Sequence, residues 1–298
     1  MQKRISCIFL LSAILVLCFA LPVRAAEEFK KVSDNRKGAV TVSSTPIYEE
    51  ASAKSQTLKT LKFGEKVVIK TQSENWYEVK KGSLKGFMKK KSVVMYNSTK
   101  KHVALTFDDG PNAKTTKKVL NALEKNKCRA TFFLVGSNIT KSTGNLLKRE
   151  KKLGCEIGNH SYSHPLLTKM STSAIKKQFT KTNQKIKKYT GENATVCRTP
   201  YGASKKRILN AAGSPHIFWS VDTLDWKYRN TKRLTSYVKK HAKDGDVILM
   251  HDIHKTTANA VDRICKDLKK KGFETVTVTE LAAIKGKKMK TGYTYSRF

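Results

Sequence analysis

From residue 101 to about residue 285, short apolar segments alternate with longer amphipathic ones. Stretches such as HVALTF, ATFFLVG, TVCRTP, HIFWSVD and DVILMHD resemble strands, and segments such as TTKKVLNALEKNK carry apolar residues at helical spacing. Seven strands of this kind are predicted over roughly 185 residues. Strands that alternate with helices form a parallel sheet covered by helices, so the pattern predicts an α/β fold.

Polar side chains stand directly after nearly every predicted strand. These clusters are Asp108–Asp109, His160–His164, Arg198–Gly202, Asp222–Trp226 and Leu249–Asp252. The carboxyl ends of parallel strands meet on one face of a barrel, so the clusters favour a closed barrel over an open sheet. The segment is shorter than the usual barrel of about 250 residues and eight strands, so an irregular (β/α)7 barrel is expected.

The segment from about residue 37 to residue 97 has a different rhythm, with short alternating strands separated by Gly, Ser, Asn and Lys turns. This pattern predicts a small all-β barrel of about 60 residues. Its end, Asn75-Trp76-Tyr77-Glu78-Val79 followed by Gly82, Gly86, Phe87 and Met88, resembles bacterial SH3-like domains. The resemblance implies a module that holds an enzyme on peptidoglycan, and a spacer with Trp76 in its core is the alternative.

The two ends of the chain are not expected to belong to either domain. Residues 1–25 have a basic start, a short apolar run and a small-residue cleavage site, which together predict a secretory signal peptide. An uncleaved signal anchor is the alternative. Residues 26–36 are predicted to be a linker, and residues 286–298 a loose basic tail.

The chain is strongly basic, with 60 Lys+Arg against 23 Asp+Glu and a net charge of +37. Removing Lys3, Arg4 and Arg24 with the signal peptide leaves 57 − 23 = +34. Such a charge favours polyanionic partners. For a secreted chain, an anionic cell wall is expected as the partner rather than nucleic acid, and no stable membrane anchor is expected.

Four of the six cysteines lie beyond the predicted signal peptide, at positions 128, 155, 197 and 265. No C-x-x-C pair is present, which argues against a zinc–thiolate site. Free buried thiols are favoured, although an extracytoplasmic protein permits disulfides and the sequence does not choose a pairing.

Two histidines and one aspartate are a ligand set typical of a catalytic divalent ion, which binds three protein side chains and leaves a position open for water; His160 and His164, four residues apart, could supply the two imidazoles. A free carboxylate beside the metal could accept a proton from that water, and an arginine near it would keep it ionised. Gly110 and Pro111 are predicted to bend the chain so that both aspartates reach one site. A structural zinc site is the alternative, against which a spare carboxylate argues.

Residues 101–285 closely resemble polysaccharide deacetylases of carbohydrate esterase family 4, the NodB-homology domain. The family's five motifs occur in order as TFDDGP, HSYSH, RTPYG, DTLDW and LMHD. The resemblance implies a metal, usually zinc, bound by Asp109, His160 and His164. It further implies that Asp108 is the catalytic base and that Arg198 holds it.

The resemblance also assigns roles to the remaining motif residues. The backbone N–H of Tyr201 would complete the oxyanion site, Trp226 and Leu249 would line the pocket for the acetyl methyl group, and His251 would be the general acid, with Asp222 raising its basicity. Asp225 could simply close a turn and Asp252 could cap the next helix, while His102 and His216 are expected to be structural.

These features together predict a secreted metal-dependent deacetylase that acts on N-acetyl groups of peptidoglycan, with N-acetylglucosamine as the expected sugar. The chain contains no G-x-S-x-G nucleophile motif, so no covalent acyl-enzyme is expected. The alternatives are a deacetylase of chitin oligomers or acetylxylan, a wall-binding protein without activity, and a polyanion binder driven by charge alone.

Overall fold

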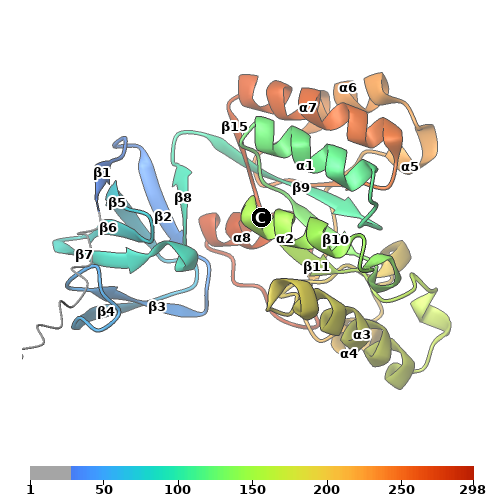
Figure 1. Ribbon diagram of the computed structural model, residues 1–298, viewed down its shortest axis with the longest axis horizontal. Helices are drawn as coiled ribbons and strands as arrows, with labels where there is room; N and C mark the ends of the chain where they lie inside the picture. Colours follow the sequence, from blue (N-terminus) through green and yellow to red (C-terminus); the bar gives the residue numbers. More distant parts are fainter. Residues whose placement is uncertain (1–27) are drawn as a thin grey trace, which may run out of the picture.

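The structure is a computed structural model that describes residues 28–298. The predicted signal peptide, residues 1–25, lies outside the described residues. Two units lie side by side, an all-β unit and a larger α/β unit (Figure 1). None of the helices from residue 28 onward has the length and apolar character needed to span a membrane.

The all-β unit is one antiparallel sheet of eight strands in the order β4-β3-β7-β6-β5-β2-β8, with β1 paired to β5. The strands are β1 (Lys30–Lys31), β2 (Arg36–Val40), β3 (Ser44–Tyr48), β4 (Thr57–Lys62), β5 (Lys66–Gln72), β6 (Trp76–Lys81), β7 (Leu84–Lys89) and β8 (Val93–Asn97). The all-β prediction is therefore confirmed, while the relation to SH3-like domains stays a prediction. The predicted linker is partly wrong, because Lys30 and Lys31 pair with β5 and Arg36 begins β2.

The α/β unit is built on a parallel sheet in the order β11-β10-β9-β14-β13, with β15 paired to the first half of β9. Its strands are β9 (Lys101–Asp108), β10 (Thr131–Leu134), β11 (Glu156–Asn159), β13 (Val221–Asp222), β14 (Val247–His251) and β15 (Phe273–Val276). The predicted α/β class is confirmed.

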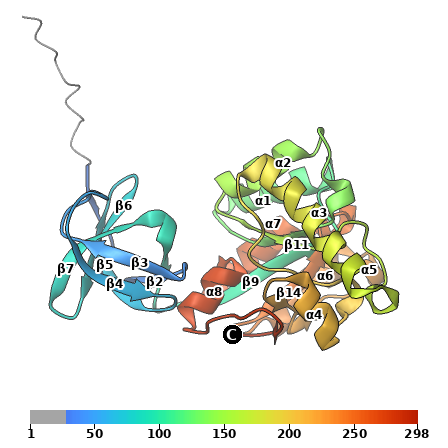
Figure 2. The same ribbon diagram turned by 90° about the horizontal axis from the view of Figure 1, so that it is seen from below.

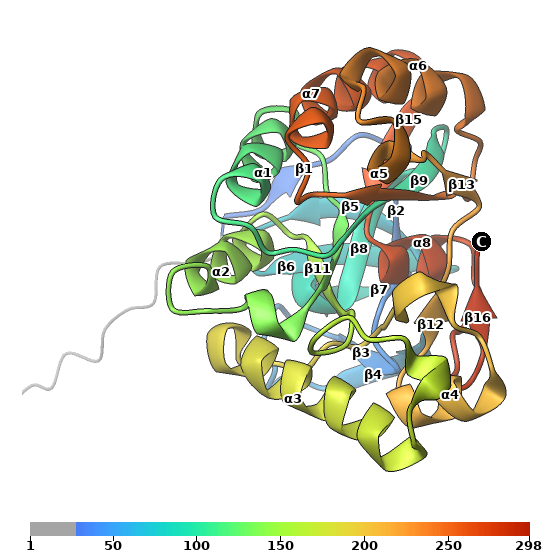
Figure 3. The same ribbon diagram turned by 90° about the vertical axis from the view of Figure 1, so that its right-hand side faces the viewer.

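Helices cover the parallel sheet, with α1, α6 and α7 on one side and α3 and α4 on the other (Figure 3). They are α1 (Thr115–Lys125), α2 (Gly144–Lys152), α3 (Thr172–Thr190), α4 (Lys206–Ala212), α5 (Asp225–Tyr228), α6 (Thr231–His241), α7 (Lys255–Lys270) and α8 (Val278–Ile284). Seven of them coincide closely with segments whose helical spacing predicted them, and the short α5 was not predicted.

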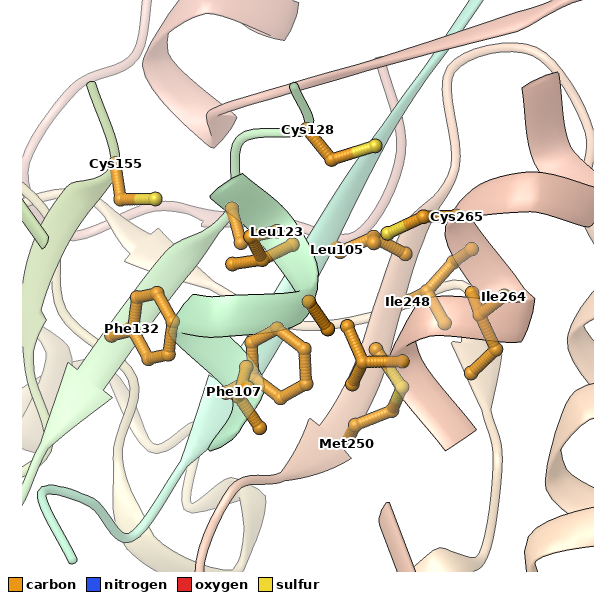
Figure 4. Packing of buried hydrophobic residues seen from close by; sticks show 14 of the residues in the cluster. Leu105, Phe107, Leu123, Cys128, Phe132, Cys155, Ile248, Met250, Ile264 and Cys265 are labelled. Atoms are coloured by element: carbon orange, nitrogen blue, oxygen red, sulfur yellow. The ribbon is translucent and has the colours of Figure 1, made fainter. Parts of the chain in front are cut away.

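The central strand β9 is buried along its whole length after Lys101, as expected for a parallel strand covered on both faces. Phe107 of β9 stacks on Phe132 of β10, with 5.2 Å between the ring centroids. These rings pack with Leu123 from α1 and Ile264 from α7 in one continuous apolar core (Figure 4). The core fixes the position of Asp108, the last residue of β9.

Two of the seven predicted strands are much reduced. The stretch TVCRTP makes only isolated bridges through Cys197, and HIFWSVD divides into β12 (His216–Ile217) and β13. At the end of β12 and just after it, the carbonyls of Ile217 and Phe218 accept hydrogen bonds from the Arg198 guanidinium. A side chain thus replaces strand pairing there. The observed pairing does not confirm closure into a barrel.

The C-terminal residues are ordered against the sheet, so the predicted loose tail is wrong. β16 (Thr294–Tyr295) pairs in parallel with β12, and Arg297 forms an ion pair with Asp246. The amide of Phe298 donates to the Gly245 carbonyl at 3.0 Å. Long-range pairing therefore holds a segment whose local composition reads as polar and basic.

The all-β unit packs against the end of the sheet at which β9 begins, and the β9 arrow points away from it (Figure 1). Helix α8 lies at this junction and contacts β2 and β8 (Figure 2). Tyr96 and Val94 from β8 share an apolar cluster with Ala104 and Leu281. The two units are therefore joined by a common core as well as by the chain.

Glu274 in β15 is the main polar link between the two units. Its carboxylate accepts hydrogen bonds from Arg36 Nη1 at 3.0 Å and from the Asn97 amide at 2.9 Å, and His102 Nε2 lies 3.4 Å away. Burial alone would raise the pKa of Glu274, but these donors outweigh it and lower the pKa to about 2.

Glu274→Gln is expected to lower the free energy of unfolding at pH 7 by about 1–3 kcal/mol, because the donors lose their charged acceptor. A carboxylate whose pKa falls from 4.5 to about 2 on folding contributes stability above pH 4.5 and loses it as the pH falls through 2. The variant should therefore lose less stability than the parent between these pH values in urea unfolding. Glu192→Gln, at an exposed ion pair with Lys151, is the control. Equal losses in both variants would contradict the role of Glu274.

Candidate active site

Asp108 and Asp109 stand at the carboxyl end of β9, where Asp108 pairs with Phe133 of β10 and His251 of β14. Side chains of consecutive strand residues normally point to opposite faces. Asp109 has a φ of 74°, in the left-handed region, which turns the chain so that both carboxylates line one cavity. The predicted bend therefore begins at Asp109 itself, one residue before Gly110.

Asp109, His160 and His164 converge at one point, with their ligand atoms all within 4.8 Å of one another. Asp109 Oδ1 lies 3.5 Å from His160 Nε2 and 3.4 Å from His164 Nε2. This buried oxygen has no hydrogen-bond partner among the described residues. A cation would satisfy it, and one carboxylate with two imidazoles is a donor set that suits zinc and similar divalent ions.

His160 is held in the tautomer that metal binding requires. It follows β11 and is almost fully buried, and its Nδ1 lies 2.6 Å from the Arg198 carbonyl. Burial lowers the pKa of His160 to about 3, so the ring is neutral and Nδ1–H donates to the carbonyl. The lone pair of Nε2 is then directed to the point shared with Asp109 and His164.

Arg198 fixes Asp108 from the interior of the protein. The guanidinium is fully buried; Nη1 donates to Asp108 Oδ1 at 2.7 Å and to Thr106 Oγ1 at 2.9 Å. Phe133 covers it, with 4.2 Å between the guanidinium carbon and the ring centroid. Burial raises the pKa of Asp108 and outweighs the opposing effects of Arg198 and His251. A raised pKa makes the oriented carboxylate a stronger base.

His251, at the end of β14, is paired with Asp225 and not with Asp222. Its Nδ1 lies 2.8 Å from Asp225 Oδ1, and its amide donates to Asp225 Oδ2 at 2.8 Å. Burial would lower the pKa of His251, but Asp225 outweighs it and raises the pKa to about 9. The proton-bearing ring faces the same cavity as Asp108.

The assignment of Asp222 as the partner of His251 is therefore wrong. Asp222 lines the cavity, and its Oδ1 accepts a hydrogen bond from the Leu224 amide at 2.9 Å. Leu224 has a φ of 53°, which reverses the chain and carries Asp225 into the interior. There Asp225 also accepts a hydrogen bond from Thr257 Oγ1 at 2.7 Å. The alternative that Asp225 merely closes a turn is wrong as well.

A cavity of about 560 Å³ joins these groups. Every predicted site residue except the buried Arg198 lines it: Asp108, Asp109, His160, His164, Tyr201, Asp222, Trp226, Leu249 and His251. Tyr201 has a φ of 57° and an exposed ring that meets the His164 ring edge-on, while Trp226 is half-exposed at the rim. The lining also includes Trp219, Arg229, Ile253 and His254.

None of these four was predicted as a site residue. Trp219 lies within HIFWSVD, whose sequence predicts one continuous buried strand. In the structure, hydrogen bonds from Arg198 to two of its carbonyls interrupt the strand pairing. Arg229 follows the unpredicted helix α5. No local sequence signal separates these residues from ordinary core or loop positions.

His216 was expected to have a structural role, and Asp252 was considered as a cap of the next helix. His216 is buried, and its Nε2 accepts a hydrogen bond from the Thr199 amide at 2.9 Å. Asp252 does not cap α7. It is buried against Gly110 and accepts a hydrogen bond from Thr116, and burial raises its pKa to about 7.

A family profile, similar sequences and solved structures all relate this chain to the same family. The sequence profile of the polysaccharide deacetylase family matches residues 96–216. Peptidoglycan-N-acetylglucosamine deacetylase PgdA of Listeria monocytogenes is 46% identical over 197 residues, which is 66% of this chain and 41% of that protein. The chain therefore spans less than half the length of this relative.

A shorter relative and a solved structure extend the match. The peptidoglycan-N-acetylglucosamine deacetylase of Bacillus cereus is 37% identical over 61% of this chain and 68% of its own length. The structure of the peptidoglycan deacetylase PdaC from Bacillus subtilis superposes with a TM-score of 0.61 at 43% identity, covering 62% of this chain and 92% of that one.

Proposed function

This chain belongs to the polysaccharide deacetylase family, and we propose that it is a secreted, metal-dependent enzyme that hydrolyses N-acetyl groups of peptidoglycan N-acetylglucosamine. The observation that carries the proposal is the single cavity shared by the oriented base Asp108, the proton-bearing His251 and the cluster of Asp109, His160 and His164. A wall-binding protein without activity would have no need of an oriented base beside a complete ligand set.

The residues of the cavity account for the hydrolysis of an acetamide. A divalent ion held by Asp109, His160 and His164 would polarise the acetyl carbonyl and lower the pKa of water. Asp108, held by Arg198, takes a proton from the attacking water. The water oxygen bonds to the carbonyl carbon, and the backbone N–H of Tyr201 is proposed to donate to the oxyanion.

His251 completes the reaction from the other side of the cavity. Its proton goes to the nitrogen as the carbon–nitrogen bond breaks, so that acetate and a free amine leave. Leu249, buried beside this ring in β14, and the half-exposed Trp226 are proposed to hold the acetyl methyl group. No side chain of the protein becomes acylated.

Peptidoglycan is proposed as the substrate on three grounds. The similar proteins of Listeria and Bacillus are named for it, the chain begins with a predicted signal peptide, and its strong basic charge suits an anionic wall. Purified peptidoglycan, chitin oligomers and acetylxylan should be compared by acetate release. The largest kcat/KM is expected on peptidoglycan, and a larger value on either other polymer would overturn the choice of substrate.

Secretion and wall contact belong to the same proposal. The all-β unit is proposed to hold the enzyme on peptidoglycan, which rests on its resemblance to bacterial SH3-like domains at Asn75–Val79. The secreted protein is expected to begin just after Ala25, and mass spectrometry of the mature N-terminus would test this. A full-length chain retained in the membrane would contradict it.

Asp225→Asn is expected to move the alkaline limb of the pH–kcat profile to lower pH by about one unit or more. The pKa of His251 is raised to about 9 because of Asp225, and the neutral amide removes that effect. The acid form of His251 is therefore lost earlier as the pH rises. Asp222→Asn is the control, since Asp222 contacts the Leu224 amide instead. A larger shift in the Asp222 variant would contradict the assigned pair.

A further inference from the structure

A second cavity lies at the opposite end of the sheet from the catalytic cavity and is larger, about 680 Å³. It is bordered by the segment before β9, the loop between α1 and β10, the ends of α2 and α7, and β15. In Figure 1 these elements face the all-β unit, and Arg36 and Met95 of that unit contribute to the lining. The length of β9 separates the two cavities by about 25 Å.

The second cavity is strongly cationic. Its charged lining residues are Arg36, Lys100, Lys127, Arg129, Lys152 and Lys269 against Glu124 and Glu274, which gives 6 − 2 = +4. Both carboxylates already have partners. Glu274 is bound by Arg36 and the Asn97 amide, and Glu124 pairs with Arg149, which lies outside the cavity lining.

Three of the lysines have no acidic partner among residues 28–298. Lys100, Lys127 and Lys152 are exposed, and none of them forms an ion pair with any residue from 28 to 298. On a convex surface, three such lysine side chains would point away from one another into solvent. Here they line a concave wall together with Lys269, which raises the local positive potential; Arg129 of the same lining is paired with Glu280 at 2.8 Å.

The ends of three helices explain only part of this charge. Helices α1, α2 and α7 finish at this side of the unit, and each helix C-terminus carries roughly half a negative charge. Three ends give about −1.5, which leaves most of the +4 unbalanced. Capping of the helix dipoles therefore does not account for the whole of this charge.

We propose that this cavity binds a phosphodiester segment of an anionic wall polymer, of the sugar- or polyol-phosphate type. Lysine and arginine side chains recognise phosphate oxygens through charge and hydrogen bonds. Nucleic acid fits less well, because single strands bind largely through stacking of bases on aromatic rings. The one aromatic residue in the described lining, Phe273, is 2% exposed.

Binding at this position would hold the α/β unit and the all-β unit together on the polymer. The catalytic cavity, at the far end of β9, would remain open to a neighbouring glycan strand. The cavity is thus a docking site that is separate from the chemistry and independent of the proposed deacetylation.

The test compares two triple variants of the full chain. Lys100→Gln/Lys127→Gln/Lys152→Gln removes three charges from the cavity, and Lys176→Gln/Lys177→Gln/Lys187→Gln removes three from the exposed face of α3. Binding of a short glycerol-phosphate oligomer is measured by calorimetry over a series of salt concentrations. The cavity variant is expected to bind at least about tenfold more weakly and with a smaller salt dependence.

The α3 variant should bind within about twofold of the parent, and both variants should keep their circular dichroism spectra. Equal weakening in the two variants would show that net charge acts without a site, and would overturn the proposal. So would an absence of measurable binding by the parent, or tighter binding of a single-stranded oligonucleotide of equal charge.

Discussion

Asp108→Asn is expected to lower acetate release from peptidoglycan by about 10²–10⁴-fold while the protein keeps its full metal content. The amide cannot accept a proton from water, but its oxygen can still accept the hydrogen bond that Arg198 Nη1 donates to Asp108 Oδ1 at 2.7 Å. Asp108 is not one of the three ligand residues, so the cluster of Asp109, His160 and His164 is unchanged. The loss should therefore appear in kcat.

The control for this variant is Asp244→Asn, at a surface aspartate that pairs with Lys285 on the far side of the unit. Both proteins should be assayed for acetate release and for bound metal by mass spectrometry. Near-parental turnover in Asp108→Asn would refute the role of Asp108 as the base. Loss of metal in that variant would place Asp108 among the ligands instead.

The site could be predicted from sequence wherever a functional residue directly follows a strong strand. Asp108 and His251 are the last residues of β9 and β14, and Asp109 directly follows β9; both strands are buried along most of their length and recognisable from their apolar residues. Parallel pairing then aligns the strand ends, as the register of Asp108 with His251 shows. Local pattern and topology point to the same answer at these positions.

Prediction failed where a distant side chain decides the local backbone. HIFWSVD has the composition of one strand, yet the guanidinium of Arg198, about twenty residues earlier in the chain, donates hydrogen bonds to two of its carbonyls. Asp225 reaches His251 only because Leu224 adopts a left-handed backbone conformation, and no glycine stands at or beside this position to predict it. The C-terminal residues pair with β12 although their composition is that of a tail. Each failure is a long-range contact that local periodicity does not encode.

His160→Ala is expected to weaken binding of the divalent metal by at least about 100-fold and to reduce acetate release to the background rate. Changes to groups that only support a ligand already cost about 10–100-fold in affinity, and His160 supplies a ligand atom itself. His254→Ala is the matched control, because His254 lines the same cavity but lies outside the ligand cluster. It should keep its metal.

The same pair of variants separates a catalytic metal from a structural one. His160 lies in the loop after β11, and the core around Phe107 and Phe132 forms without any ligand residue. His160→Ala should therefore keep its near-ultraviolet circular dichroism and its cooperative unfolding while it loses the metal. If the variant unfolds when the metal is lost, the ion holds the fold together, and the oriented base beside it would need another explanation. If it stays folded and inactive, the ion acts in the reaction that Asp108 and His251 are placed to carry out.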